Sequence, residues 1–499
     1  MKPLRKVLIA NRGEIAVRIA RTLRDMGIAS VAVYSEADRD ALHVAAADEA
    51  FPIGPAPAVE SYLNVERLLT VARKAGCDAL HPGYGFLSES PELADACAHA
   101  QLEFIGPPAA AMRRMGLKVE AREAMRDAGV PIIPGGPAGD LEDARRSASA
   151  IGYPVLLKPS AGGGGKGMRR VHSEAELPEA LERAKSEARS AFGNDAVYME
   201  KLLDGARHVE VQLLADRHGN VVHLYERDCS LQRRHQKIVE ETPCLALAPE
   251  RVDEIGRIAV RGAQAIGYWS AGTMEFLLAP TGELYFLEMN TRLQVEHPIT
   301  EACTGVDLVE EMVRIACGEP LRLSAPPPRS GHAIECRIYA EDPEQGFLPS
   351  PGRIDKLVLP AGPGVRNDEG ARAGQLIPAD YDPLVAKLIV HGRDRGQALR
   401  RALRALSEYR ITGIATNVHF LRRVLAHEAF VEDRHDTRFL DENLADVLGS
   451  PATPSAAQLA ALAALKHHAS QTSALRPSGA SAAATSPWVL AHRRSSWSR

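Results

Sequence analysis

The chain has 499 residues, of which 45% are hydrophobic and 25% are charged. At about 150 residues per domain this length predicts roughly three domains, and the composition excludes a wholly disordered, collagen-like or coiled-coil chain. A formal net charge of −4 and an aromatic content of 5% argue against nucleic-acid binding. No apolar run reaches the roughly 18 residues of a membrane span, and residues 7–10 are too short for a signal-peptide core. The seven cysteines are scattered without a C-x-x-C pair, so we expect reduced thiols in a soluble, cytoplasmic protein.

The first segment alternates short strands with helices. Residues 6–10 and 30–34 read as strands, whereas residues 14–26 and 62–74 read as helices. This alternation predicts a doubly wound parallel sheet. The loop after the first strand lacks a G-x-G-x-x-G fingerprint, so we expect a scaffold there and not a nucleotide site. The loop that starts at His81 follows a strand, at the sheet edge where such folds place ligands.

Residues 131–140, rich in proline and glycine, predict a loop between two segments. Beyond them an apolar strand, residues 153–158, ends in Lys158 and precedes a loop with five glycines in six positions. Glycine lets backbone N–H groups wrap phosphate oxygens, and lysine adds positive charge. A phosphate-binding loop is favoured over the alternative, a flexible surface linker.

A hairpin follows in residues 272–289, with turn residues between two strands. Centring its turn between Thr281 and Gly282 places Glu275 opposite Glu288, at about 4.5–5.5 Å between Cβ atoms. Two carboxylates so placed repel unless a cation lies between them. Oxygen ligands beside a phosphate loop indicate Mg²⁺.

Two-residue periodicity places a polar set on one face of the segment that follows: Glu288, Asn290, Arg292, Gln294 and Glu296. A solvated sheet face is the alternative, but we favour a functional site. Residues 226–237 are dense in charged donors suited to anion binding, although charge runs are usually solvated. We interpret Cys229 as a spacer, whose basic neighbours account for a shifted thiol pKa without catalysis.

The C-terminal part begins after a proline break at residues 324–328. Residues 331–447, with a helix over 394–408, predict a compact α+β domain. From Ser450 onward the chain has no Asp or Glu, and only residues 458–467 favour a helix. We expect the remainder of this Ala/Ser-rich tail to be a disordered or truncated linker.

Several long motifs occur in order: IANRGEIAVRI, HPGYGFLSES, KPSAGGGGKGM, ERDCSLQRRHQK, EFLL with FLEMNTRLQVEHP, and GHAIECRIYAEDP. Together they resemble biotin carboxylase, an ATP-grasp enzyme, over residues 4–445. The resemblance implies α/β and α+β parts: a Rossmann-like N-terminal domain (1–117), an ATP-grasp domain (118–318) with a mobile lid at about 133–203, and a C-terminal domain (331–447), before the tail (448–499).

The implied reaction is carboxylation of biotin by bicarbonate and ATP through carboxyphosphate, with Mg²⁺ or Mn²⁺. Glu296 would be the general base, and Arg337 would stabilise the biotin enolate. The resemblance assigns ATP to Lys118, Lys158, Gly163, Gly164, Gly165, Lys166, Gly167, Glu200, Lys201, Leu203, His208, Gln232, His235, Glu275 and Glu288. It assigns the metal to Glu275, Glu288 and Asn290, bicarbonate to Lys237, Arg292, Gln294 and Val295, and biotin to Tyr84, Gly85 and Arg337. Lys237 and Arg292 also count among the catalytic residues.

The loop of the lid and the Tyr381-Asp382-Pro383 turn look closer to α subunits of propionyl- and methylcrotonyl-type carboxylases than to free-standing acetyl-CoA carboxylase subunits. No Met-Lys-Met biotinylation motif occurs, so we expect a carrier in trans or a truncated α subunit. The expected partners are a biotin carboxyl carrier, a second copy of the chain and a carboxyltransferase subunit. Two alternatives stay open: another ATP-grasp ligase, of the carbamoyl-phosphate synthetase kind, and an inactive remnant.

Overall fold

The computed structural model describes residues 3–159, 168–449, 460 and 463–465. Contacts divide the chain into two units, Met1–Leu448 and Gly449–Arg499, each considered by itself. Residues 460 and 463–465 are helical, within the helix expected at 458–467, whose other residues lie outside the described part, as does nearly all of the glycine-rich loop. No helix among the described residues is long and apolar enough to cross a membrane.

The N-terminal segment forms a five-stranded parallel sheet in the order β3-β2-β1-β4-β5. The chain leaves β1 toward β2 and later returns to its other side at β4, so the loops after β1 and β4 meet at a topological switch point. The strands are β1 (Lys6–Ile9), β2 (Ala29–Ser35), β3 (Glu49–Gly54), β4 (Ala79–His81) and β5 (Glu103–Phe104). The helices are α1 (Gly13–Asp25), α2 (Leu42–Ala46), α3 (Val65–Ala75), α4 (Pro91–His99) and α5 (Ala109–Gly116).

The predicted helix at 62–74 begins three residues late. Asn64 caps α3, since its side chain accepts a hydrogen bond from the Arg67 backbone N–H, and Gly76 ends the helix at φ 67°. Tyr62 is left outside the helix, fully buried and stacked on Phe86.

After α6 (Lys118–Asp127) comes a four-stranded antiparallel sheet with its own apolar core. Its order is β6-β9-β7-β8, with β6 (Gly135–Pro137), β7 (Val155–Pro159), β8 (Arg169–Val171) and β9 (Val197–Lys201), packed against α7 (Leu141–Ile151) and α8 (Leu177–Phe192). The loop predicted at 131–140 therefore contains a short strand, because β6 pairs with β9 despite its glycines and proline.

An eight-stranded antiparallel sheet forms the largest layer, in the order β14-β13-β10-β11-β12-β15-β22-β20. Its strands are β10 (Arg207–Ala215), β11 (Val221–Arg233), β12 (Gln236–Thr242), β13 (Ser270–Leu278), β14 (Leu284–Asn290), β15 (His332–Tyr339), β20 (Val365–Glu369) and β22 (Leu384–Gly392). Since β12 pairs with β15, the sheet continues across residues 318–331, where the sequence predicts a domain boundary. The predicted domain limits stay a prediction.

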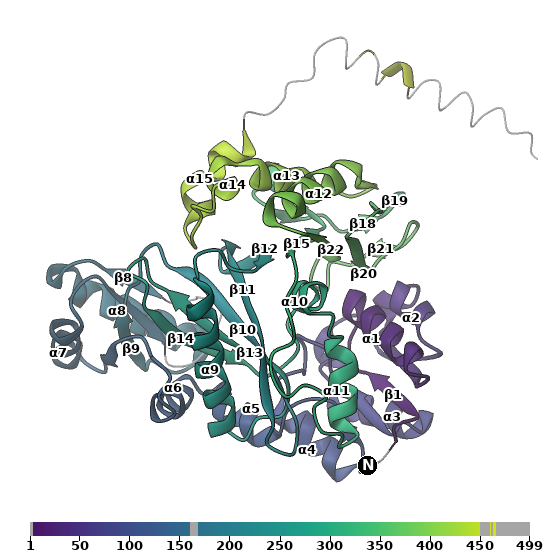
Figure 1. The fold of residues 1–499 in the computed structure, drawn as a ribbon, viewed down its shortest axis with the longest axis horizontal. Coiled ribbons are helices and arrows are strands. Elements are labelled where there is room, and N and C mark those ends of the chain that lie inside the picture. Colours follow the sequence, from purple (N-terminus) through teal and green to yellow (C-terminus); the bar gives the residue numbers. More distant parts are fainter. Residues whose placement is uncertain (1–2, 160–167, 450–459, 461–462, 466–499) are drawn as a thin grey trace, which may run out of the picture. The chain divides into compact units, whose positions relative to one another are not determined.

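Helices cover this sheet (Figure 1). They are α9 (Pro249–Ala265), which packs on β10 and β11, and α10 (His297–Thr304), α11 (Leu308–Ala316), α12 (Arg395–Glu408), α13 (Val418–Ala426), α14 (Glu428–Val431) and α15 (Phe439–Leu448). The helix expected at 394–408 matches α12, whose N-cap is Asp394. Small strand pairs are β16 (Glu341–Asp342) with β17 (Leu348–Pro349), β18 (Gly352–Arg353) with β21 (Leu376–Ile377), and β19 (Lys356–Val358) with β23 (Arg410–Thr412). Single 3₁₀ turns occur at Glu36–Asp38, Ala58–Glu60, Glu174–Glu176 and Pro343–Gln345.

Candidate active site

The β13–β14 hairpin places Glu275 directly opposite Glu288, as the sequence predicts. The route to that pairing differs from the prediction. Next to the turn Leu278 faces Leu284, one residue out of the predicted register, and a bulge between Glu275 and Phe276 shifts the register back. The predicted pairing of the two carboxylates is therefore confirmed, whereas the predicted centre of the turn is wrong.

Glu275 is the buried member of that pair. Its Oε1 accepts hydrogen bonds from Lys237 (2.9 Å), Asn290 (2.8 Å) and Gln294 (3.0 Å), and its Oε2 lies 2.9 Å from His208 Nε2. Burial by itself would raise the pKa of Glu275, but Lys237 and His208 outweigh it and hold that pKa well below the ordinary value. Glu275 is thus ionised, whereas the side chain of Glu288 is exposed to solvent.

The predicted run of alternating residues from Glu288 to Glu296 does not stay extended, because β14 ends at Asn290 and Glu296 occupies the position before the first residue of α10. The side chains nevertheless converge. Arg292 donates to Asn290 Oδ1 (2.9 Å) and to Gln294 Oε1 (2.7 Å), so its guanidinium links the two amides that donate to Glu275. The bend brings them together where a flat strand would space them apart.

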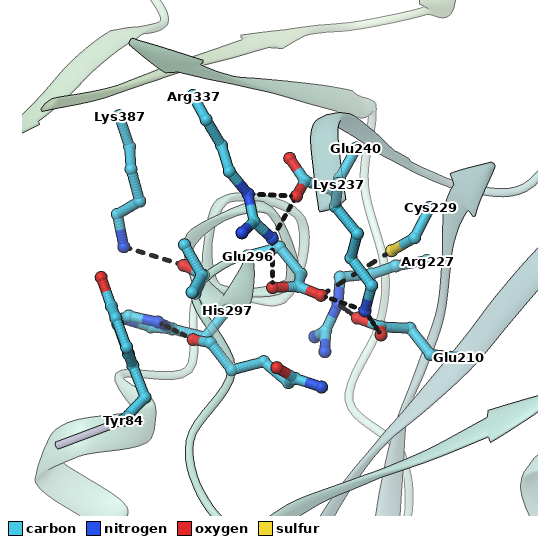
Figure 2. Close-up of polar contacts among 12 residues, drawn as sticks. Tyr84, Glu210, Arg227, Cys229, Lys237, Glu240, Glu296, His297, Arg337 and Lys387 are labelled. Atoms are coloured by element: carbon cyan, nitrogen blue, oxygen red, sulfur yellow. Dashed lines mark hydrogen bonds and ion pairs between the residues drawn. The ribbon is translucent and has the colours of Figure 1, made fainter. Parts of the chain in front are cut away.

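Lys237, near the start of β12, joins three carboxylates from three elements. Its Nζ lies 2.6 Å from Glu210 of β10, 2.9 Å from Glu275 of β13 and 2.7 Å from Glu296. These neighbours hold the pKa of Lys237 well above its ordinary value despite burial, which opposes them. The ammonium is therefore permanently charged and fixed at the centre of the cluster (Figure 2).

Glu296 is fully buried between two cations. One oxygen accepts from Lys237, and the other accepts from Arg337 (3.0 Å), which also binds Glu240 through its Nε (2.6 Å; Figure 2). Burial would raise the pKa of Glu296, but Lys237 and Arg337 outweigh it and keep the carboxyl ionised. A carboxylate and two cations facing each other can bind a small anion that carries a proton.

Cys229, on β11, is buried and lies 3.9 Å from Glu296 Oε1. Burial and Glu210 raise the pKa of this thiol well above its ordinary value, with Lys237 opposing them. The basic neighbours in sequence therefore do not activate the thiol. Its interpretation as a spacer stays a prediction.

Several positions predicted for ATP lie on or near the four-stranded sheet β6-β9-β7-β8. Lys158 of β7 pairs with Glu200 of β9, and Lys201 donates to the carbonyls of Gly152 and Tyr153 (3.0 Å each).

Lys118, at the start of α6, is half-buried. Desolvation and the charge of Lys158 lower the pKa of Lys118, whereas Glu288 and Glu200 oppose this fall. The loop positions Gly163, Gly164, Gly165, Lys166 and Gly167 lie outside the described residues.

The other predicted ATP positions differ in whether they contact the cluster around Glu275. Gln232 contacts His208 Nδ1 (2.6 Å) and so belongs to it. His235 is exposed at the β11–β12 turn with φ 66°, away from those contacts, and Leu203 is half-buried beyond β9. The sequence cluster at 226–237 thus divides into buried and solvated members.

The loop after β4 carries the predicted biotin residues Tyr84 and Gly85. The Asn11 amide donates to the carbonyls of Pro82 and Tyr84 (2.7 Å each), which clamps the loop. Gly83 has φ 65°, and a Cβ there would lie 3.0 Å from Asn11 Nδ2, so the close approach requires glycine. Across the site, Lys387 donates to the Val295 carbonyl (2.8 Å; Figure 2).

The donor set at the hairpin fits a hard divalent cation. Glu275 is ionised and Glu288 lies opposite it in register. Asn290 donates its amide N–H to Glu275 and its Oδ1 accepts from Arg292, so this amide would have to turn to offer its oxygen to the cation. Mg²⁺ and Mn²⁺ prefer such oxygen ligands, usually shared with substrate phosphates. The residues predicted for the metal therefore suit it chemically.

Family models match three consecutive segments of the chain. Residues 3–112 match the biotin carboxylase N-terminal domain, residues 118–324 the ATP-binding domain of the carbamoyl-phosphate synthase L chain, and residues 335–442 the biotin carboxylase C-terminal domain. Biotin carboxylase 1 of Bacillus subtilis is 51% identical over 451 residues, which is 90% of this chain and 100% of that protein. The chain belongs to the biotin carboxylase family.

Other biotin carboxylase relatives agree in sequence and structure. Biotin carboxylase of Halalkalibacterium halodurans is 51% identical over 88% of this chain and 98% of its own length. Biotin carboxylase of Campylobacter jejuni, solved as an ATP complex, superposes with a TM-score of 0.85 at 45% identity, over 88% of this chain and 99% of that one. The biotin carboxylase domain dimer of Hydrogenobacter thermophilus 2-oxoglutarate carboxylase, solved with MgADP, ADP and bicarbonate, gives 0.85 at 46% identity, over 90% and 100%.

Sequence reasoning missed several residues that build this biotin carboxylase site. Arg227 is fully buried and donates to Glu210 (2.5 Å), Gln212 (2.8 Å) and Thr300 (2.8 Å), so it supports the carboxylate that binds Lys237. Glu89 accepts from Arg292 Nε (3.1 Å). Arg122 pairs with Glu200. Only Arg227 had a signal, the density of charged donors in residues 226–237, because the partners of Glu89 and Arg122 lie 203 and 78 positions away from them.

Proposed function

We propose that this biotin carboxylase activates bicarbonate at the cluster around Glu296. The enzyme carboxylates the biotin of a carrier protein with bicarbonate and ATP. Bound bicarbonate would lie among Lys237, Arg292, Gln294 and the backbone of Val295, and it would give its proton to Glu296. Its oxygen then bonds to the γ-phosphorus of ATP as the bond to ADP breaks, which forms carboxyphosphate.

Carboxyphosphate splits into CO₂ and phosphate. Phosphate takes the proton of the biotin ureido nitrogen, and that nitrogen then attacks CO₂. Arg337 would stabilise the negative charge that develops on the ureido oxygen, because its guanidinium is always protonated and already fixed by Glu240 and Glu296. Tyr84 and Gly85 would contact the biotin ring. Lys118, Lys158, His208 and the glycine loop would bind the ATP phosphates, and Mg²⁺ or Mn²⁺ bound by Glu275, Glu288 and Asn290 would offset phosphate charge.

The observation that carries these assignments is the position of Glu296 between Lys237 and Arg337. Each cation pairs with Glu296, so Lys237 is held in place for bicarbonate and Arg337 is held in place for the ureido oxygen. Once bicarbonate accepts a hydrogen bond from Lys237, this cation stabilises the Glu296 carboxylate less, and the pKa of Glu296 rises. Glu296 then becomes a better base beside the bicarbonate proton that it accepts.

The test measures ADP release by the purified chain with MgATP and bicarbonate, with and without free biotin. We expect release that depends on bicarbonate and rises with biotin. Glu296→Gln should lower it at least about 100-fold while ATP binding is kept. Glu310→Gln, at a surface helix pair with Arg314, is the matched control and should leave the rate unchanged. Full activity in Glu296→Gln would contradict the base assignment, and amine-dependent turnover without biotin would favour a ligase of the carbamoyl-phosphate type.

We further propose a cytoplasmic homodimer that works with a biotin carboxyl carrier and a carboxyltransferase subunit. A dimer is named for the Hydrogenobacter thermophilus domain, and methylcrotonoyl-CoA carboxylase α subunits are among the relatives, at 50% identity for the mouse protein. The chain spans 63% of that longer subunit. Light scattering would measure the oligomeric state, and carboxylation of added carrier proteins would identify the partner.

A further inference from the structure

Glu14 is a buried acid next to the proposed site, and neither the motifs nor the steps above give it a role. It lies in the first turn of α1, at the switch point of the N-terminal sheet, with 3% of its surface exposed. A charged side chain is rarely buried to this degree unless it is paired. Its partners therefore indicate what it does.

One partner is Tyr84, whose hydroxyl donates to Glu14 Oε1. The other is Lys387 of β22, whose Nζ lies 3.1 Å from the same oxygen. Lys387 is itself fully buried, donates to the Val295 carbonyl at 2.8 Å, and lies 5.8 Å from the centre of the Tyr84 ring. Figure 2 shows Tyr84 and Lys387 side by side at one edge of the site.

These contacts form one chain of residues, Tyr84–Glu14–Lys387–Val295. Its ends are the tyrosine proposed to contact biotin and the backbone proposed to contact bicarbonate. The links come from the loop after β4, helix α1, strand β22 and the segment before α10. A single carboxylate oxygen is the shared acceptor in the middle.

The charged groups facing Glu14 come from every element packed on that side of α1. They are Lys387 on β22, Asp368 and Arg366 on β20, and the Tyr84 hydroxyl on its loop. Burial raises the pKa of Glu14 to about 7; Lys387 and Arg366 oppose this rise, and Asp368 adds to it. Glu14 therefore changes charge in the range where bicarbonate is the main form of dissolved CO₂.

We propose that Glu14 is a positioning residue that couples the biotin contact of Tyr84 to the bicarbonate contact of Val295 through Lys387. The proposal rests on the proposed function, since it uses the assigned roles of Tyr84 and Val295. In its ionised form Glu14 fixes the tyrosine hydroxyl and the lysine ammonium together. When it takes up a proton, the ion pair with Lys387 is lost and both ends of the chain loosen.

The test is Glu14→Gln, which keeps the shape and removes the charge. ADP release is titrated with biotin and with bicarbonate from pH 6 to pH 9, with bicarbonate concentrations corrected for CO₂. At pH 8.5 we expect the KM for biotin and the KM for bicarbonate each to rise about tenfold, the effect of one charge-assisted contact, with kcat within about threefold. At pH 6 the wild type should approach the variant. Asp25→Asn, an exposed acid at the end of the same helix, should change neither KM.

Tyr84→Phe provides a second variant from the other side of the same contact. It should raise the bicarbonate KM in the wild-type background and not in Glu14→Gln. A rise in the biotin KM alone, or a loss of kcat at all pH values together with a lower thermal midpoint, would overturn the coupling. A wild type without biotin-stimulated ADP release would overturn the proposed function itself, and this inference with it.

Discussion

Replacing Arg337 by Gln tests the electrostatics of the site most directly. The guanidinium is almost fully buried and holds Glu240 at 2.6 Å and Glu296 at 3.0 Å. Removing one member of a buried ion pair costs about 3–5 kcal/mol, because the remaining charge has no water to solvate it. We expect a loss of that size in the free energy of unfolding at pH 8.5.

The loss should shrink in acid, and Glu240 is the reason. Burial raises its pKa to about 7, Arg337 lowers it, and Glu296 raises it. Without Arg337 the pKa of Glu240 in the folded protein rises further. A carboxyl whose pKa is higher in the folded than in the unfolded protein lowers the free energy of unfolding as the pH rises above its unfolded pKa. At pH 6 Glu240 is largely protonated in both the wild type and Arg337→Gln. The difference in their free energies of unfolding is therefore smaller than at pH 8.5, by about 1.4 kcal/mol for each unit by which the substitution raises the pKa of Glu240.

The measurement is the urea midpoint by circular dichroism at pH 6 and pH 8.5, converted with the slope of each transition. Arg434→Gln is the control, because Arg434 makes exposed pairs with Glu428 and Glu432 and should cost less than about 1 kcal/mol at either pH. Equal losses for Arg337→Gln at the two pH values would refute the reasoning about Glu240. The biotin-dependent ADP release of Arg337→Gln should also fall at least about 100-fold.

The remaining predictions concern the hairpin and the thiol. Glu275→Gln should abolish the gain in ADP affinity that Mg²⁺ provides in calorimetry, whereas Glu283→Gln, in the exposed turn of the same hairpin, should keep it; equal Mg²⁺ dependence in both variants would contradict the metal assignment. Cys229→Ala should keep kcat within about threefold, since burial holds the thiol protonated, and a loss beyond about 100-fold would reject its interpretation as a spacer.

Local sequence patterns predicted the features of this protein that depend on residues close together in the sequence. The strand and turn chemistry of residues 272–289 sufficed to place Glu275 opposite Glu288, since a hairpin joins residues close in sequence. The compensating bulge was not predicted, because the extra residue lies on β14 while β13 keeps an unbroken register with β10, and the turn residues carry no signal for it. Helix α12 was predictable from its periodicity and cap, whereas the start of α3 depended on the burial of Tyr62.

The family motifs led to most of the residues that converge on the site, but not to the contacts that set their charge. Glu296 lies 41 positions from Arg337 and 59 from Lys237, and Glu14 pairs with Lys387 across almost the whole unit. Only the closing of the eight-stranded sheet beside the N-terminal sheet brings these pairs together. Sequence therefore determined which groups can ionise and the reaction they suit; tertiary structure alone decided which are buried against which, and so which carry charge at neutral pH.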